Sequence, residues 1–426
     1  MSREAICAMH DSRPTVYLFT ETYPYVGPDD PFLPAEVRVL ARTLDVCLIP
    51  TAMGAEPVAS DLGGVRVELG LSEYASRAGT RVLSLVQSLV TADLYRELAR
   101  QRPLSLRPRA AATIGTRLSR ALTVERWVRR HLLPIDRPAV VYSWWSAAYA
   151  VGLARALRSA DTPLITRAHG YDLYAQQEVI GFVPFQSMLL DRVDRVMSAS
   201  EAGTAYLRQR FPGRASKVST AYLGIEGQPE TSGASVDGVL RLVSCSAVSP
   251  VKRVELLARA LSVVAERRPD LRFHWTHIGD GELSAHLAAY LESQPSLAGS
   301  WALTGFLEPA SVKAWLMDNP VDLFVNVSAS EGLPVSLMEA ASFGIPMMAT
   351  AVGGNPEIVD NTCGVLLRPD PTPGEIAQAV LDFAAVDSER LQALRTGSRE
   401  RWEALFTADH NYEAFATMLI KAAVEH

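Results

Sequence analysis

The sequence predicts an α/β protein built from two doubly wound domains. The chain has 426 residues, which is more than one hydrophobic core usually organises. Short apolar runs alternate with helical stretches along the whole chain, as in parallel sheets covered by helices on both faces. The alternation stops once, at residues 225–238, which are rich in Gly, Ser, Pro and acids, and then restarts. We therefore expect two sheets that face each other across a cleft, with ligands at the carboxyl ends of the strands.

The first half opens with a strand, a helix at about 32–43 and a second strand, which together make a βαβ unit. Residues 80–133 are expected to be mostly helical, with breaks near Pro103 and Pro108, because proline interrupts a helix interior. The strands expected in this half are 16–19, 45–50, 65–69, 139–145, 163–170, 193–200 and 217–224.

The second half repeats the alternation after the expected linker. The expected strands are 240–247, 271–279, 300–304, 321–327, 346–351 and 364–367. The expected helices are 253–267, 282–293, 309–318 and 335–343, and the last 50 or so residues look helical. The expected domains are therefore residues 1–225 and residues 239–408.

Composition narrows the class of protein. The hydrophobic fraction of 48%, the charged fraction of 21% and the net charge of −6 are those of an ordinary globular protein, and they argue against a nucleic-acid partner. The cysteines have no metal-binding spacing, so reduced thiols are expected: Cys7, Cys47, Cys245 and Cys363. No signal peptide or run of about 20 apolar residues is visible, which makes a cytoplasmic location the expectation.

Residues 328–346, SASEGLPVSLMEAASFGIP, raise the sharpest question, since Glu331 and Glu339 stand in an otherwise apolar segment. A buried strand ends before Glu331, Gly332-Leu333-Pro334 makes a turn, and a helix then begins. The free backbone N–H groups at that helix start are suited to an anion. Two acids around such a helix start could hold a ligand with hydroxyls at both ends and phosphate between them, which is the form of a nucleotide-sugar.

This block, E-G-L-P-x-S-x-x-E-A-x-x-x-G-I-P, resembles the signature of the family-4 retaining glycosyltransferases of GT-B fold. Further segments resemble that family, so the likeness spans nearly the whole chain and is weakest at 50–135. They are TETYPYVGPDDPFLPAE (20–36), RAHGYDLY (167–174), TAYLGIE (220–226), SCSAVSPVKRVELLARAL with Lys252 and Arg253, IGDGEL (278–283), TGFLEP (304–309) and AVGGNPEIV (351–359).

The resemblance implies a role for each matching residue. Glu339 would accept hydrogen bonds from the ribose hydroxyls, and Glu331 from the donor sugar. Lys252, with Arg253, would neutralise the diphosphate. His169 would reach the donor sugar from the first domain, and His169, Glu331 and Lys252 form the implied catalytic set. The implied donor site also includes Gly27, whose loop would approach the phosphates, the backbone around Phe306, which would contact the base, and Gly332, Leu333, Pro334 and Val335.

The implied activity is retaining, metal-independent transfer of a sugar from a nucleotide-diphosphate sugar, with UDP favoured. No metal or other cofactor is expected, and the acceptor would be a glycan, a lipid-linked molecule or a small molecule. The donor would bind mainly to the second domain and the acceptor to the first, on which the terminal helix, 409–426, would pack. One departure stands out: many members carry an arginine where this chain has Ala247.

Other interpretations remain beside this one. A non-catalytic or epimerase-type GT-B protein that binds a nucleotide-sugar would share these motifs, whereas a phosphorylase would need a further lysine for pyridoxal. The pair His274 and His277 suggests a metal, but in a strand a spacing of three places them on opposite faces. The turn Gly279-Asp280-Gly281 lacks the third glycine of a dinucleotide fingerprint, so a nicotinamide enzyme is not expected.

Residues 96–137 hold 11 arginines against Glu97, Glu125 and Asp136. One interpretation is a solvated, arginine-rich helical face. The other is a surface for anionic lipid headgroups or for a lipid-diphosphate acceptor, which would place the protein peripherally at the inner face of the membrane.

Overall fold

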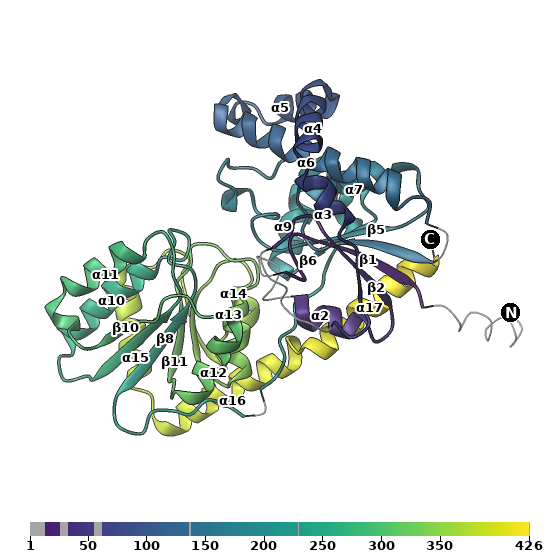
Figure 1. Cartoon of the computed structure of the whole chain (residues 1–426). Helices are drawn as coiled ribbons and strands as arrows, with labels where there is room; N and C mark the ends of the chain where they lie inside the picture. The colour runs from purple at the N-terminus through teal and green to yellow at the C-terminus, as the bar shows by residue number, and fades with distance from the viewer. Residues whose placement is uncertain (1–12, 26–32, 55–61, 136–137, 229, 426) are drawn as a thin grey trace, which may run out of the picture. The chain divides into compact units, whose positions relative to one another are not determined.

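The computed structural model describes residues 13–25, 33–54, 62–135, 138–228 and 230–425. The chain divides into two compact units. Unit 1 comprises residues 1–224 and 408–426, as far as they are described, and unit 2 comprises residues 225–407. Figure 1 shows a sheet with helices around it in each unit. The predicted fold class, two parallel doubly wound sheets, is confirmed.

Unit 1 contains a parallel sheet in the order β3-β2-β1-β4-β5-β6-β7. The order reverses between β1 and β4, and the loops after these two strands therefore diverge at the switch point. The strands are β1 (Thr15–Thr20), β2 (Asp45–Pro50), β3 (Arg66–Val67), β4 (Ala139–Ser143), β5 (Leu164–Ala168), β6 (Arg195–Ser198) and β7 (Val218–Thr220).

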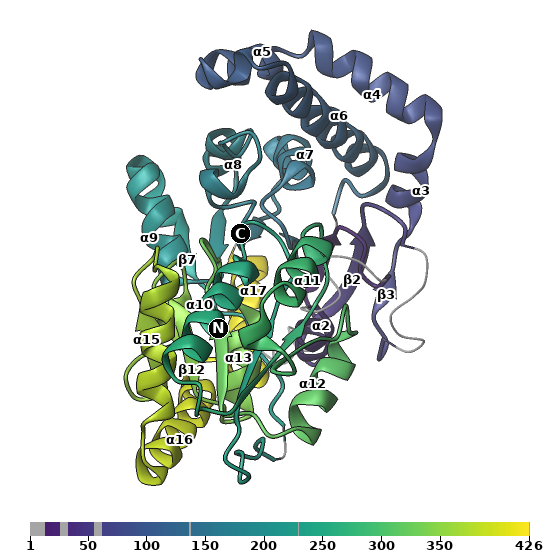
Figure 2. The ribbon, with the colours of Figure 1, turned by 90° about the vertical axis from the view of Figure 1, so that its left-hand side faces the viewer.

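The helices of unit 1 form more than one layer. Helix α7 contacts β5, α6 packs on α7, and α4 packs on α6, so α4 lies in an outer layer, as Figure 2 also shows. The helices are α2 (Leu33–Leu40), α3 (Gly70–Ser76), α4 (Ala78–Val90), α5 (Ala92–Arg100), α6 (Pro108–His131), α7 (Ala148–Ala156), α8 (Gln186–Arg192), α9 (Glu201–Arg210) and α17 (Ala408–Glu425).

A buried ion pair lies at the centre of unit 1. Arg167 of β5 donates from Nη1 to Glu36 of α2 over 2.7 Å, and both side chains are fully buried. The Arg167 guanidinium lies 4.3 Å from the ring centroid of Phe415, and Tyr412 donates to the Gly224 carbonyl over 3.1 Å. Since a buried charge needs a partner, Arg167 joins α2, the sheet and α17 into one core.

Unit 2 contains a parallel sheet in the order β10-β9-β8-β11-β12-β13, which reverses between β8 and β11. Its strands are β8 (Leu240–Cys245), β9 (Phe273–Ile278), β10 (Trp301–Leu303), β11 (Leu323–Asn326), β12 (Met347–Thr350) and β13 (Gly364–Leu367). Its helices are α10 (Val254–Arg267), α11 (Ser284–Glu292), α12 (Pro309–Asp318), α13 (Val335–Ser342), α14 (Asn355–Ile358), α15 (Pro373–Ala384) and α16 (Ser388–Leu405).

Residues 225–238, the expected linker, hold no helix or strand in their described part, and that part packs against unit 2. Gly227 lies so close to the Trp402 indole that an added Cβ would be 2.3 Å from a ring carbon. Ser232 is 3% exposed and its carbonyl accepts from Arg395 of α16. The composition of this segment correctly indicated irregular backbone. It did not show that the segment packs against other residues.

Candidate functional site

The switch point of unit 2 brings together the two loops that carry the strongest motif residues. One loop follows β8 and leads through Lys252 to α10, and the other follows β11 and leads through Glu331 to α13. In open parallel sheets, ligands bind outside the carboxyl ends of the strands at such a point.

An ion pair spans this switch point. Lys252 Nζ lies 2.8 Å from both carboxylate oxygens of Glu331, and Asn326 Nδ2 donates to Glu331 Oε1 over 3.1 Å. Glu331 is 6% exposed, so its charge is stabilised by these donors rather than by water. The structure thus joins two of the predicted catalytic residues, one from each half of the sheet.

The Glu331 loop is held in place by the glycines that follow β12. The N–H of Gly354 donates to the Gly332 carbonyl over 2.8 Å. Gly353 has a φ of +51°, and an added Cβ would lie 1.9 Å from the Glu331 carbonyl oxygen. Only glycine allows this approach, which explains why AVGGNPEIV accompanies the glutamate motif.

Arg253 acts in a different way from its neighbour Lys252. Its Nε donates to the Val327 carbonyl over 2.7 Å, its Nη2 to the Ser328 carbonyl over 2.8 Å, and its Nη1 to Asp370 over 2.9 Å. These bonds engage all three guanidinium nitrogens and fix the end of β11. This geometry favours a role in positioning the loop after β11. The predicted contact of Arg253 with a diphosphate stays a prediction.

Glu339 lies on α13, one helical turn beyond the helix start at Val335. No side chain caps this helix, so its first N–H groups face the loop that carries Leu333 and Pro334. Glu339 is half-buried, and burial raises the pKa of its carboxyl to about 7, although Lys313 opposes the shift. Within the described residues the Glu339 carboxylate makes no hydrogen bond or ion pair.

The end of β8 lies near this acid. Burial raises the pKa of the Cys245 thiol to about 12, and the negative charge of Glu339 adds to the effect. Glu339 therefore lies near the carboxyl end of β8, close to the pair formed by Lys252 and Glu331. Together these groups offer an ammonium, two carboxylates and a helix N-terminus at one place.

The loops after β9 and β10 extend the same edge of the sheet. Gly279 has a φ of +140°, and an added Cβ would lie 2.0 Å from the Ser246 carbonyl oxygen. The N–H of Gly279 donates to the Gly305 carbonyl over 2.9 Å, which brings Phe306 and its 68% exposed side chain to this edge. The predicted glycine turn and the predicted base-contacting loop are thus adjacent.

Aromatic side chains gather in unit 1 at the carboxyl ends of β4 and β5, beside the switch point. The His169 ring, which follows β5, lies 4.7 Å from the Trp144 ring and 4.6 Å from the Trp145 ring, centroid to centroid. Asp172 is fully buried and accepts hydrogen bonds from the N–H groups of His169, Gly170 and Ser146. The buried carboxylate therefore fixes the backbone that presents His169. The predicted residue Gly27 lies outside the described residues.

Several of these groups were not predicted from the sequence. Asn326 is the last residue of an apolar strand. A single amide side chain at the carboxyl end of such a strand could have indicated a site residue. Asp172 and the Trp144-Trp145 pair lie in the expected segments, but their packing depends on contacts between strands. His277 is buried and bonds through Nδ1 to Ser244 Oγ over 2.8 Å, while His274 is half-buried, so the two are not brought together as metal ligands.

Among the described residues, no group of three or more His, Cys, Asp or Glu side chains is arranged to hold a metal ion. No helix in these parts of the chain combines the length and the apolar character that crossing a membrane requires.

Comparison with family models gives two matches. Residues 63–228 match the model described as glycosyltransferase family 4, and residues 240–385 match the model described as glycosyl transferases group 1. The first lies in unit 1 apart from its last residues, and the second lies in unit 2 and contains Lys252, Glu331 and Glu339.

Similar proteins point the same way. The chain is 25% identical over 249 residues to the Escherichia coli glycosyltransferase WcaL, which is named for colanic acid biosynthesis, and this covers 56% of the chain but only 60% of WcaL. Among solved structures, Anabaena HepE in complex with UDP and glucose has a TM-score of 0.66 at 16% identity, covering 95% of this chain and 99% of HepE. The lipopolysaccharide outer core galactosyltransferase WaaB has a TM-score of 0.66 at 13% identity with the same coverage. These likenesses identify the two-sheet architecture as the GT-B fold.

Proposed function

Since the chain belongs to the group 1/family 4 glycosyltransferases, we propose that it transfers a sugar from a UDP-sugar to an acceptor hydroxyl during polysaccharide synthesis. The observation that carries the proposal is the ion pair of Lys252 and Glu331 at the switch point, beside the unpaired, half-buried Glu339. The complex of HepE with UDP and glucose and the colanic acid role in the name of WcaL support the donor and the pathway class.

The ion pair suggests how the site changes when a donor binds. Without a donor, Lys252 and Glu331 neutralise each other. A diphosphate would attract the Lys252 ammonium, and Glu331 would then accept hydrogen bonds from the sugar hydroxyls, while Glu339 would accept them from the ribose. The ion pair would thus hold Lys252 near the diphosphate and Glu331 near the sugar, so that little movement of either side chain is needed when the donor binds.

The leaving nucleotide needs positive charge near its phosphates. Lys252 and the N–H groups at the start of α13 supply this charge in the proposed mechanism, so a metal ion is not required. An assay in EDTA tests this point, since activity that is lost in EDTA and restored by a divalent cation would contradict it.

We further propose front-face substitution with retention of configuration. The bond from the anomeric carbon to the UDP oxygen breaks, the bond to the acceptor oxygen forms on the same face, and the leaving phosphate takes the acceptor proton. A carboxylate nucleophile would instead form a glycosyl-enzyme adduct. Detection of such an adduct by mass spectrometry of the intact protein would overturn this route.

The acceptor is assigned to unit 1 in this proposal, because Lys252, Glu331 and Glu339, which would hold the donor, all lie in unit 2. A glycan, a lipid-linked molecule and a small molecule remain candidate acceptors, and a hexose donor is assumed. The role expected for His169, contact with the transferred sugar, is tested by substitution below.

The decisive experiment is a calorimetric titration of UDP, GDP and ADP into the purified protein with EDTA present. We expect UDP to bind, and Glu339→Ala to abolish that binding while the protein remains folded by circular dichroism. Equal binding of all three nucleotides, or unchanged UDP binding by the variant, would contradict the assigned donor site.

Ala247 favours a second candidate, a family member that binds a nucleotide-sugar without transferring the sugar. Ala247 is exposed in the loop after β8, so no side-chain cation stands at this position. UDP-sugar binding with neither transfer nor hydrolysis across a panel of acceptors would establish this alternative.

A further inference from the structure

Helix α4 (Ala78–Val90) has its polar and apolar faces reversed. Thr80, Ser84 and Ser88 face inward and are 8%, 0% and 0% exposed, and Ser84 Oγ lies 2.7 Å from Thr123 Oγ1 of α6. A helix on the surface of a soluble protein normally turns its apolar side chains to the core and its polar side chains to water. Here small hydroxyl side chains make the contact with α6.

The opposite face of α4 is apolar and exposed. Its side chains form what we call the α4 face, together with Tyr95 of α5, whose hydroxyl donates to the Leu89 carbonyl. They are Val82 (62% exposed), Leu83 (47%), Leu85 (50%), Val86 (54%), Leu89 (53%), Val90 (78%) and Tyr95 (59%). Single exposed apolar residues are ordinary, but a contiguous group of this kind marks an interaction surface.

Exposed arginines flank the residues of the α4 face along the chain. Across residues 77–109, all of which the structure describes, the charged side chains that are exposed are arginines. They are Arg77, Arg81, Arg96, Arg100, Arg102, Arg107 and Arg109.

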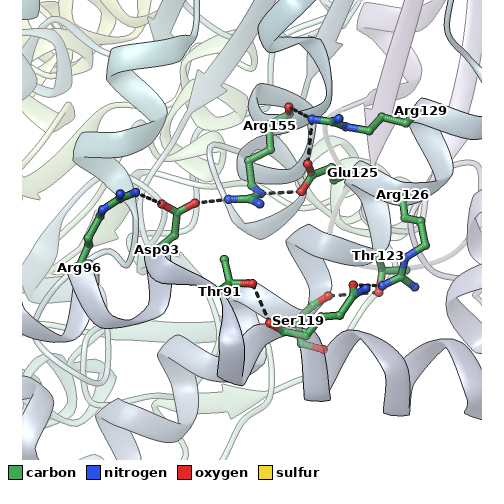
Figure 3. A network of polar contacts seen from close by, with 10 residues as sticks. Thr91, Asp93, Arg96, Ser119, Thr123, Glu125, Arg126, Arg129 and Arg155 are labelled. Atoms are coloured by element: carbon green, nitrogen blue, oxygen red, sulfur yellow. Dashed lines mark hydrogen bonds and ion pairs between the residues drawn. The ribbon is translucent and has the colours of Figure 1, made fainter.

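The two acids of the same segment are turned inward. Asp93 is 7% exposed and accepts from Arg155 of α7, as Figure 3 shows. Glu97 is 2% exposed and accepts from the N–H of Phe185 over 3.0 Å. Arg96 also pairs with Asp93 and Arg100 with Glu97, so the excess positive charge at the surface of this segment rests on the other five arginines.

We propose that the α4 face docks on an anionic membrane surface, with the apolar side chains in the lipid interface and the arginines at the headgroups. Apolar side chains flanked by arginines suit the boundary between acyl chains and negatively charged headgroups. A second copy of this chain suits the face less well, because a twofold contact would bring the same arginines of both copies together.

This proposal moves the membrane contact away from most of the segment in which the sequence first suggested it. Three arginines farther along α6 are engaged within the protein: Arg117 pairs with Glu178, Arg129 pairs with Glu125 over 3.0 Å, and Arg126 donates to Tyr74 over 3.1 Å. The docking face therefore begins on α4, N-terminal to residues 96–137. It does not depend on the proposed transferase activity.

The test is flotation of the full chain with phosphatidylcholine vesicles, with and without phosphatidylglycerol, at low salt. We expect binding only to the anionic vesicles. Leu85→Ser/Leu89→Ser should weaken this binding at least about tenfold, because two leucines would leave the interface. Both side chains are exposed, so the variant should keep the wild-type melting temperature.

The matched apolar control is Val236→Ser/Val424→Ser, which changes exposed valines elsewhere and should bind as wild type does. For charge, Arg102→Glu/Arg107→Glu should abolish binding, whereas Arg210→Glu on α9 should not. The proposal is overturned if the wild-type chain binds neither vesicle, or if the leucine variant binds as tightly as wild type. It is also overturned if the leucine substitutions dissociate a dimer, because the face would then be covered by a second copy.

Discussion

The two units have the same strand order around their switch points but offer different chemistry at the carboxyl ends of the strands there and alongside. In unit 2 the loops after β8 and β11 present Lys252 and Glu331, and Glu339 lies nearby. In unit 1 the loops after β4 and β5 present Trp145 and His169. The fold sets where a ligand binds, and the side chains set which ligand, so the charged site suits a nucleotide diphosphate and the aromatic site suits a sugar ring.

The units also use buried charge differently. Arg167 and Glu36 in unit 1 are both fully buried and hold α2, the sheet and α17 together. Lys252 in unit 2 keeps 26% of its side chain exposed while it bonds to Glu331. The first pair has no access to a ligand, whereas the second can exchange its partner for one.

The largest expected effect comes from Lys252→Ala, which should lower sugar transfer by about 10³-fold or more, because the leaving diphosphate loses its cation. Removal of the ammonium also leaves Glu331 buried without its ionic partner, so the melting temperature should fall. Initial rates and thermal denaturation measure the two effects separately.

The control is the double variant Lys252→Met/Glu331→Gln, which removes the unpaired charge. It should recover most of the melting temperature but none of the activity. Transfer by Lys252→Ala at more than about a tenth of the wild-type rate would mean that another cation serves the diphosphate.

Arg167→Met tests the structural pair of unit 1. It should cost about 3–5 kcal/mol of unit 1 stability, because Glu36 keeps a buried charge without a partner. Denaturant unfolding measures this loss, and Arg167→Met/Glu36→Leu should recover most of it. Both variants should bind UDP with wild-type affinity. A loss of UDP affinity would mean that the Arg167–Glu36 pair also supports the donor site, and not only the core of unit 1.

His169→Ala should lower transfer by about 10–100-fold, the usual range for loss of one or two hydrogen bonds to a reacting group. UDP affinity measured by calorimetry should not change, because UDP without its sugar does not need this side chain. An equal loss of UDP affinity would place His169 at the nucleotide instead.

The course of the chain could be predicted from the sequence, since each expected strand has its counterpart in the two sheets. Residues 45–50 and 364–367 agree to the residue, because buried parallel strands are short apolar runs with sharp ends. The Lys252 and Glu331 segments could be recognised because each motif is a short, continuous stretch of sequence. Such local patterns do not depend on distant parts of the chain.

Features that depend on distant partners could not be predicted. Arg167 and Glu36 are 131 positions apart, and no local pattern shows that they form a buried pair. Arg253 stands beside Lys252 in the sequence and was expected to act with it on the diphosphate. Its guanidinium, however, donates to the carbonyl groups that follow β11. Helix α4 turns its hydroxyl side chains inward, where Ser84 contacts Thr123 of α6, and a sequence pattern alone gives the usual, opposite orientation.

Glu339→Gln should remove a pH dependence of UDP binding. Burial raises the pKa of Glu339 to about 7, so the carboxylate that would accept hydrogen bonds from the ribose is increasingly protonated below that pH. Wild-type affinity should therefore fall by up to about tenfold per pH unit below 7. The glutamine variant should bind more weakly at pH 8 and show no such slope between pH 5 and 8.

The same shift has a consequence for stability. The pKa of Glu339 is raised in the folded protein, so ionisation favours unfolding and stability falls as the pH rises from about 4.5 to about 7. Glu339→Gln should accordingly be more stable than wild type at pH 8, by about 1–3 kcal/mol, and equal to it near pH 4. Urea unfolding at both pH values measures the difference, and a glutamine variant that is less stable at pH 8 would contradict the buried, unpaired state of this acid.

The smallest effect is expected at Phe306, although its side chain is 68% exposed at the edge of the proposed donor site. If the backbone of this loop contacts the base, Phe306→Ala should change UDP affinity by less than about threefold. Gly305→Ala should cost more, because Gly305 has a φ of +71° and its carbonyl accepts from Gly279. Calorimetry on both variants separates the two modes of contact. A loss of tenfold or more in Phe306→Ala would mean that the base stacks on the ring, and unit 2 would then share the aromatic chemistry that now distinguishes unit 1.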